Sequence, residues 1–256
     1  MSTISQQIRH LMSLDPIKRQ TLISFISIIS ITLIGYGSTV YFAHVLGPAI
    51  LGSYYLFLAY YGIFELIGDG GFGGAAVKRI TEGQDQNEYF SAYIVLRIFL
   101  LIISLLLLVT LSPYFIDLNN SGLLPWLFIA LIIATVASIA HYGVYGAAQA
   151  GVAQVSNFFK MFIRILFQIV AIYLGYSVAG LAGGVIAGLI ASLLIDLKYL
   201  QLFIVRFKLE HLKGLFSFSF WLFLSSGGSL VFSYADTILI GYFLSSSEVG
   251  IYRVAF

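Results

Sequence analysis

A row of polar side chains recurs at helical spacing within an apolar part of the chain. Asn157, Lys160, Arg164 and Gln168 are separated by three, four and four residues, which places all four on one face of a helix. At 1.5 Å per residue, Gln168 lies about 16 Å beyond Asn157. A cationic face of this kind suits an anionic ligand in a polar cavity. The competing interpretation is that Lys160 and Arg164 reach back to the polar surface at the helix end, but Gln168 lies too deep for that.

Two carboxylates occupy a second apolar stretch. Glu65 and Asp69 lie one helical turn apart, so their charges repel unless a proton or a cation offsets them. Arg97 lies about two turns into the next apolar stretch and is the expected partner. The set predicts either an ion pair that fastens two helices or a site for proton or cation coupling.

The remaining polar groups give weaker indications. Asp236 ends a helical face of small hydroxyl residues and is a candidate for a functional site, with ordinary helix packing as the alternative. His141 has no other ligand at metal spacing, so neither a metal nor a cofactor is expected. Asp196 is expected to pair with Lys198 or with water. No catalytic motif is present, so we do not expect an enzyme.

The composition explains why charges in these stretches matter. Of the 256 residues, 60% are hydrophobic and only 9% are charged, whereas about a quarter of the residues in a soluble domain are charged. So few charges cannot cover a globule in water. The net charge of +2 gives no reason to expect a nucleic-acid partner.

Apolar segments long enough to cross a bilayer recur along the chain, since a spanning helix needs roughly 20 such residues. We therefore predict an all-α integral membrane protein, a bundle of about seven transmembrane helices plus the start of an eighth. The predicted spans are 21–45, 50–77, 91–112, 123–148, 157–174, 179–204 and 217–243.

The basic residues orient these spans. All Lys and Arg except Arg253 lie on one side of the predicted bundle, and positive charge is retained in the cytoplasm during insertion. The sequence therefore predicts a multi-pass protein of the cytoplasmic membrane with a cytoplasmic N-terminus. Residues 1–20 form the cytoplasmic N-terminal segment, in which 5–18 suit either a short helix lying on the membrane surface or a frayed polar tail with some apolar residues.

An internal repeat divides the rest. At an offset of 198 residues, Leu46 aligns with Leu244, Gly52 with Gly250 and Tyr54 with Tyr252. Six spans per repeat make both copies run the same way, as in transporters built from two halves. We expect a six-helix lobe over 21–204, the start of a second lobe over 205–256, and a longer protein of which this chain is a part.

Several stretches resemble a known family. They are LGPAILGSYY at 46–55, GDGGFGGAAVKRI at 68–80, LGYSVAGLAGG at 174–184 and YADTILIGYFLSSSEVGIY at 234–252. The chain resembles polysaccharide biosynthesis proteins of the Wzx type, flippases for lipid-linked oligosaccharides in the superfamily that includes MATE transporters. The resemblance implies that a lipid-pyrophosphate-linked glycan crosses the cytoplasmic membrane by alternating access, with membrane lipids and other polysaccharide assembly proteins as partners.

Two other functions stay open. A cation-coupled multidrug exporter of the same superfamily is favoured if Glu65 and Asp69 bind a coupling ion. An envelope glycan polymerase or ligase would need a long external loop, and every predicted external loop is short. For the flippase, the expected substrate cavity contains Asn157, Lys160, Arg164, Gln168 and Asp236.

Overall fold

The computed structural model describes residues 16–255, and this part of the chain consists of helices, turns and short extended segments. The helices are α2 (Pro16–Asp69), α3 (Phe72–Thr81), α4 (Gln86–Leu111), α5 (Ile116–Asn120), α6 (Leu124–Gly146), α7 (Ala150–Tyr173), α8 (Val178–Tyr199), α9 (Leu209–Phe243) and α10 (Ser246–Ala255). A short 3-10 helix, Ser112–Tyr114, joins α4 to α5. The surface helix expected over 5–18 lies mostly outside the described residues.

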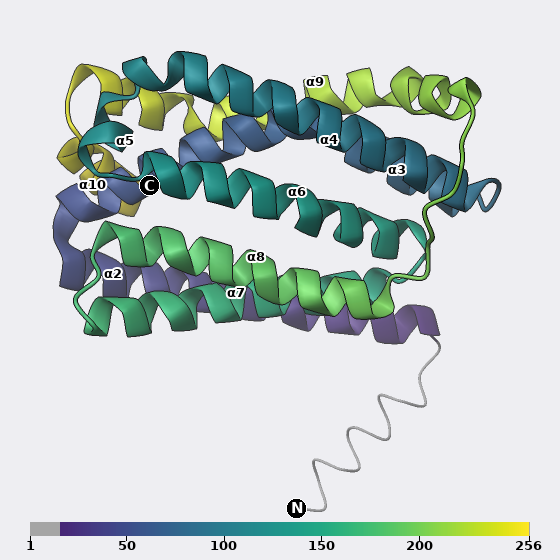
Figure 1. Cartoon of the computed structure of the whole chain (residues 1–256). Helices are drawn as coiled ribbons and strands as arrows, with labels where there is room; N and C mark the ends of the chain where they lie inside the picture. The colour runs from purple at the N-terminus through teal and green to yellow at the C-terminus, as the bar shows by residue number, and fades with distance from the viewer. Residues whose placement is uncertain (1–15, 256) are drawn as a thin grey trace, which may run out of the picture.

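Helix α2 folds back on itself and forms two arms. Its 54 residues would extend about 81 Å if straight, far more than the roughly 30 Å of a bilayer core. The reversal occurs at Gly47, which has φ 76° and ψ 170° and is followed by Pro48. Only glycine readily adopts this backbone conformation. In Figure 1 the first arm (16–46, purple) runs to one end of the bundle, and the second arm (48–69, blue) returns from it.

The structure confirms the predicted class of fold. Six helices in the described part of the chain are long and apolar enough to cross a membrane. One of the six is α2, so counting its two arms separately gives the seven predicted passes, and α10 follows them. The long helices lie roughly parallel (Figure 1), as expected of a bundle whose backbone polar groups must be satisfied within each helix.

Small residues bring α7 and α8 into close contact. A Cβ on Gly184 would overlap Gln168 and the carbonyl of Arg164, and a Cβ on Gly188 would overlap the carbonyl of Lys160. Glycines four residues apart on α8 therefore let the two backbones approach, as is common between membrane helices. Leu127, Leu131, Leu181 and neighbouring buried side chains fill the space between α6 and α8.

Several predicted boundaries need correction; for example, α4 begins at Gln86 and not at 91, and α9 begins at Leu209 and not at 217. The span predicted to end at 204 ends at Tyr199, and 200–208 are not helical. The backbone amides of Phe203 and Val205 donate instead to Asn87 and Ser91 on α4, at 2.9 and 2.8 Å. An apolar run alone cannot distinguish such a segment from a helix. In addition, α7 begins at Ala150 and not at 157, and the second arm of α2 ends at Asp69 because Gly70 and Gly71 have positive φ.

The kink of α2 and the start of α10 touch through a reciprocal contact. A Cβ on Gly52 would overlap the backbone of Ser246, and a Cβ on Gly250 would overlap the backbone of Pro48. The 198-residue offset relates Gly52 to Gly250 and Pro48 to Ser246. Shifting each residue to its counterpart in the other repeat therefore converts one contact into the other. Such reciprocal contacts are the pattern of an interface between two copies related by a two-fold axis. We call this contact the glycine seam.

Candidate functional site

Two adjoining cavities lie inside the bundle and share Tyr61, Glu65 and Tyr142 in their walls. The inner pocket, of about 220 Å³, lies among the second arm of α2, α6, α7 and α8; it is lined by Tyr61, Glu65, Ala134, Ala137, Ser138, His141, Tyr142, Lys160, Leu189 and Ser192. The α9 cleft, of about 420 Å³, faces Ser226, Leu230 and Tyr234 of α9. Asp69 and Arg164 also line this cleft.

The carboxylates face these cavities because of helical spacing. Tyr61, Glu65 and Asp69 follow each other at four-residue intervals on the second arm of α2, so they share one face. The structure brings Glu65 and Arg97 together as a hydrogen-bonded ion pair between α2 and α4. The Arg97 side chain is fully buried, whereas that of Glu65 is 26% exposed. The negative partner therefore lies on the cavity side of the pair.

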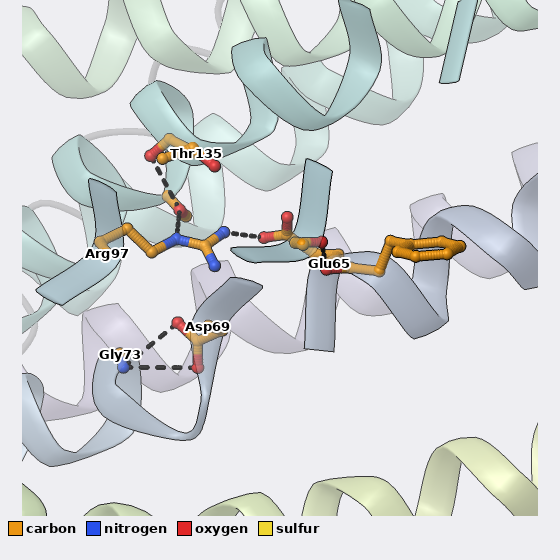
Figure 2. A network of polar contacts seen from close by, with 8 residues as sticks. Glu65, Asp69, Gly73, Arg97 and Thr135 are labelled. Atoms are coloured by element: carbon orange, nitrogen blue, oxygen red, sulfur yellow. Dashed lines mark hydrogen bonds and ion pairs between the residues drawn. The ribbon is translucent and has the colours of Figure 1, made fainter. Parts of the chain in front are cut away.

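Further contacts hold Arg97 in place (Figure 2). Its Nε donates to the hydroxyl of Ser138 on α6 at 3.1 Å, while Nη1 is buried without a hydrogen-bond partner. A Cβ on Gly68 would lie 3.2 Å from Nη1, so the glycine makes room for the guanidinium. Figure 2 shows Asp69 beside Arg97 with its carboxylate accepting from the backbone amide of Gly73, at 3.2 Å. Arg97 thus joins α2, α4 and α6.

The polar face of α7 points into the protein. Arg164 donates to the hydroxyl of Tyr54, and Gln168 donates to the same hydroxyl and to the carbonyl of Leu181, both at 2.8 Å. Gln168 is 1% exposed. Lys160 lines the inner pocket. The side chains of Arg164 and Gln168 therefore do not reach back to the lipid headgroups.

Two of the candidate residues lie apart from these cavities. Asn157 is half-buried on α7 and belongs to neither cavity wall. Asp236, near the end of α9, accepts hydrogen bonds from the Tyr252 hydroxyl and from the backbone amide of Thr237. That pair joins α9 to α10 close to the glycine seam.

The sequence analysis missed a pair formed between α6 and α8. Asp196 contacts His141 Nδ1 at 3.2 Å, and not Lys198 as expected. Asp196 is fully buried, and its contact with His141 places its carboxylate against α6. Neither residue signals the other in the sequence, because 55 positions separate them. The signal available in the sequence was the position of Asp196 within an apolar stretch, because a carboxylate buried there needs a polar partner.

The ionisable groups of this region balance in formal charge. Glu65, Asp69 and Asp196 oppose Arg97, Lys160 and Arg164. The cationic side chains on α7 have no carboxylate within ion-pair distance in the described part of the chain, whereas Arg97 does. Positive charge is therefore concentrated along α7. Among the described residues, no group of three His, Cys, Asp or Glu is placed to hold a metal ion.

The fold and the site define a multi-pass helical membrane protein with a charged cavity inside the bundle. Residues 17–256 match the family described as "Polysaccharide biosynthesis protein", and the chain belongs to this family. This confirms the resemblance seen in the sequence.

Two curated relatives from Haloferax volcanii agree with the family match. "Probable low-salt glycan biosynthesis flippase Agl15" is 26% identical over 84% of this chain and 46% of that protein. "Probable flippase AglR" is 25% identical over 93% of this chain and 50% of that protein. The chain thus spans about half the length of the curated relatives it matches. No solved structure matches it significantly.

Proposed function

We propose that this chain forms one lobe, and the start of a second, of a flippase that moves a lipid-linked glycan between membrane leaflets. The observation that carries the proposal is Arg164. This residue lines the α9 cleft about 21 Å from the start of α7, and its guanidinium is bonded to a phenol and not to a carboxylate. An unpaired cation at that depth is costly unless an anion binds there.

The chemistry of the two cations suits a phosphate linkage. Arginine can grip phosphate through two parallel hydrogen bonds, while lysine acts as a point charge. Arg164 and Lys160 lie one turn apart on α7 and line adjoining cavities. In a low dielectric their attraction for a pyrophosphate is several times larger than in water. The names of the relatives support a glycan as the rest of the cargo.

The orientation and the lobes belong to the same proposal. We place the turn between α3 and α4 and the segment 200–208 in the cytoplasm, because the basic residues gather at that end. The opposite end holds the glycine seam. Its reciprocal contacts support two lobes related by an axis along the membrane normal, 21–204 and 205–256 onward, that alternate in access about this seam. The partners of this protein at the membrane would be the lipid-linked glycan and the enzymes that build and use it. Transport of the glycan requires no catalytic step by this chain.

The cation-coupled exporter has one observation in its favour. The α9 cleft is lined by two carboxylates, Glu65 and Asp69, and by three tyrosines, which suits a lipophilic cation. Glu65 is however already paired with Arg97, and the matched relatives are named flippases. The flippase is therefore the better supported function.

The test is substitution of Arg164 in the full-length protein, produced in a cell that lacks its own flippase. Arg164→Glu should reduce surface glycan at least about tenfold, because it reverses the charge that meets the phosphate, and Arg164→Lys should reduce it only partly. Arg206→Glu, at an exposed position in the segment 200–208, is the matched control and should behave as wild type. Protein levels in the membrane must be equal. Undiminished surface glycan with Arg164→Glu refutes the role.

A further inference from the structure

A third cavity lies on the other side of Arg164. This lateral pocket, of about 160 Å³, lies between the two arms of α2 and α7. Gly35, Ser38, Thr39 and Phe42 of the first arm form one wall, and Tyr54, Met161 and Arg164 are among the residues opposite. The first arm also carries Tyr36, Val40 and Tyr41, which do not line the pocket and are all exposed. The pocket is therefore one helix away from the outer surface of the described bundle.

The polar floor of the lateral pocket has more donors than acceptors. The hydroxyl of Tyr54, a buried residue, already accepts from Arg164 and Gln168. Both of its lone pairs are used, and its own hydrogen meets no acceptor among the described residues. Arg164 Nε is buried without a hydrogen-bond partner. Such groups are costly to bury unless a ligand completes them, and the missing partner must be an acceptor.

Two further hydroxyls lie within the same pocket. Ser38 and Thr39 both donate to the carbonyl of Gly35, at 2.8 and 3.1 Å. One of these bonds can be exchanged for a bond to a ligand while the carbonyl keeps the other. Apolar side chains also line the pocket, namely Phe42, Leu51, Met161 and Ile165, beside the polar side chains of Tyr55 and Gln168. The pocket thus combines a cationic floor with apolar side chains from both arms of α2 and from α7.

Arg164 lines both the lateral pocket and the α9 cleft, so one residue borders two chemically different spaces. An amphipathic lipid phosphate needs this arrangement, because its chain is excluded from a polar cavity while its glycan is excluded from lipid. Resting on the proposed function, we propose that the lateral pocket holds the lipid-proximal phosphate of a polyprenyl-linked substrate. The prenyl chain then leaves between the first arm of α2 and α7, and the glycan extends from Arg164 into the α9 cleft.

Binding of radiolabelled undecaprenyl monophosphate to the full-length protein in phosphatidylcholine nanodiscs tests this inference. Ser38→Leu fills the lateral pocket and should weaken binding about tenfold or more, whereas Ser226→Leu fills the α9 cleft and should leave it within about twofold. Tyr54→Phe removes only the hydroxyl and should weaken binding a few-fold. Undecaprenol, which lacks the phosphate, should bind at least about tenfold more weakly than the phosphate. Monodisperse elution and an unchanged melting temperature establish that each variant is folded.

Several outcomes would overturn the assignment. Wild-type binding by folded Ser38→Leu removes the lateral pocket from the site, and loss of binding with Ser226→Leu places the phosphate in the cleft instead. Equal displacement by phosphatidylglycerol makes the pocket a site for bilayer headgroups, and displacement by submillimolar inorganic phosphate makes it a free-anion site. Absence of lipid-phosphate binding by the wild type contradicts the proposed function itself. Failure of the proposed function can therefore be distinguished from failure of the lateral-pocket assignment.

Discussion

Arg97 illustrates how a single buried charge organises this bundle. Its side chain has no solvent exposure and contacts Glu65 on α2 and Ser138 on α6. Burying a guanidinium costs several kilocalories per mole, and its ion pair offsets part of that cost. Since Nη1 still lacks an acceptor, the pair is a device for holding three helices in register more than a source of net stability.

Removal of one partner should therefore be worse than removal of both. We predict that Glu65→Leu lowers the free energy of unfolding by about 3–5 kcal/mol, because it leaves Arg97 buried and unpaired. The double variant Glu65→Leu with Arg97→Met should recover part of that loss. Thermal unfolding in detergent, followed by loss of monomer on size exclusion, measures both. A double variant no more stable than Glu65→Leu alone would contradict the argument.

At the same scale, helical spacing predicted which residues share a face but not which residues meet across helices. Lys160, Arg164 and Gln168 are related by spacing along one helix, and in the structure they point into the bundle. Tyr54, which binds two of them, lies more than a hundred positions away. His141 and Asp196 likewise meet only because α6 packs on α8. Such partners depend on helix packing, which a single sequence does not encode locally.

At the scale of elements, hydrophobic length predicted the number of helices and left their ends uncertain. The turn at Gly47 was visible as a Gly-Pro pair, which is a strong signal for a helix break. The extended segment 200–208 was not, because its apolar side chains resemble a helix end. What fixes it is a pair of hydrogen bonds to Asn87 and Ser91. Those contacts come from α4 and exist only in the folded bundle.

The glycine seam makes a prediction about these elements. Gly52→Ala places a methyl group against the backbone of Ser246 and Gly250, which cannot move as a side chain can. We expect a loss of about 1–3 kcal/mol of stability, the usual cost of overpacking. Gly37→Ala is the matched control on the first arm of the same helix. Its added Cβ meets nothing within 4 Å, so it should be neutral or stabilise the helix by up to about 1 kcal/mol.

Melting temperatures of the two variants in the same detergent decide the matter. Equal melting temperatures for Gly52→Ala and Gly37→Ala would show that the seam is not a tight contact. A loss confined to Gly52→Ala supports the reciprocal packing on which the two-lobe proposal depends. Gly250→Ala should then repeat the effect, because it would overlap the backbone of Pro48 in the same way.

At the scale of the whole molecule, the two ends of the bundle differ in both charge and structure. One end carries the turn between α3 and α4, the exposed Lys208 and most of the basic residues. The other carries the kink of α2, helix α5 and the turn between α7 and α8 (Figure 1). The proposed flippase must keep these ends on opposite sides of the membrane, because it would present its phosphate site to one leaflet at a time. The seam lies at the second end, so the α9 cleft would open more easily toward the first.

The absence of cysteine from the sequence permits a direct test of that orientation. We predict that single cysteines replacing Asp117 and Ser177 react with a membrane-impermeant maleimide applied to intact cells. Cysteines replacing Gln84 and Lys208 should react only after the cells are opened, because the basic end remains in the cytoplasm during insertion. The last two positions are exposed in the fold, so their protection can come only from the membrane. Labelling of Gln84→Cys or Lys208→Cys in intact cells, with Ser177→Cys protected, would invert the bundle. The basic end could then no longer be the side from which a substrate made in the cytoplasm enters.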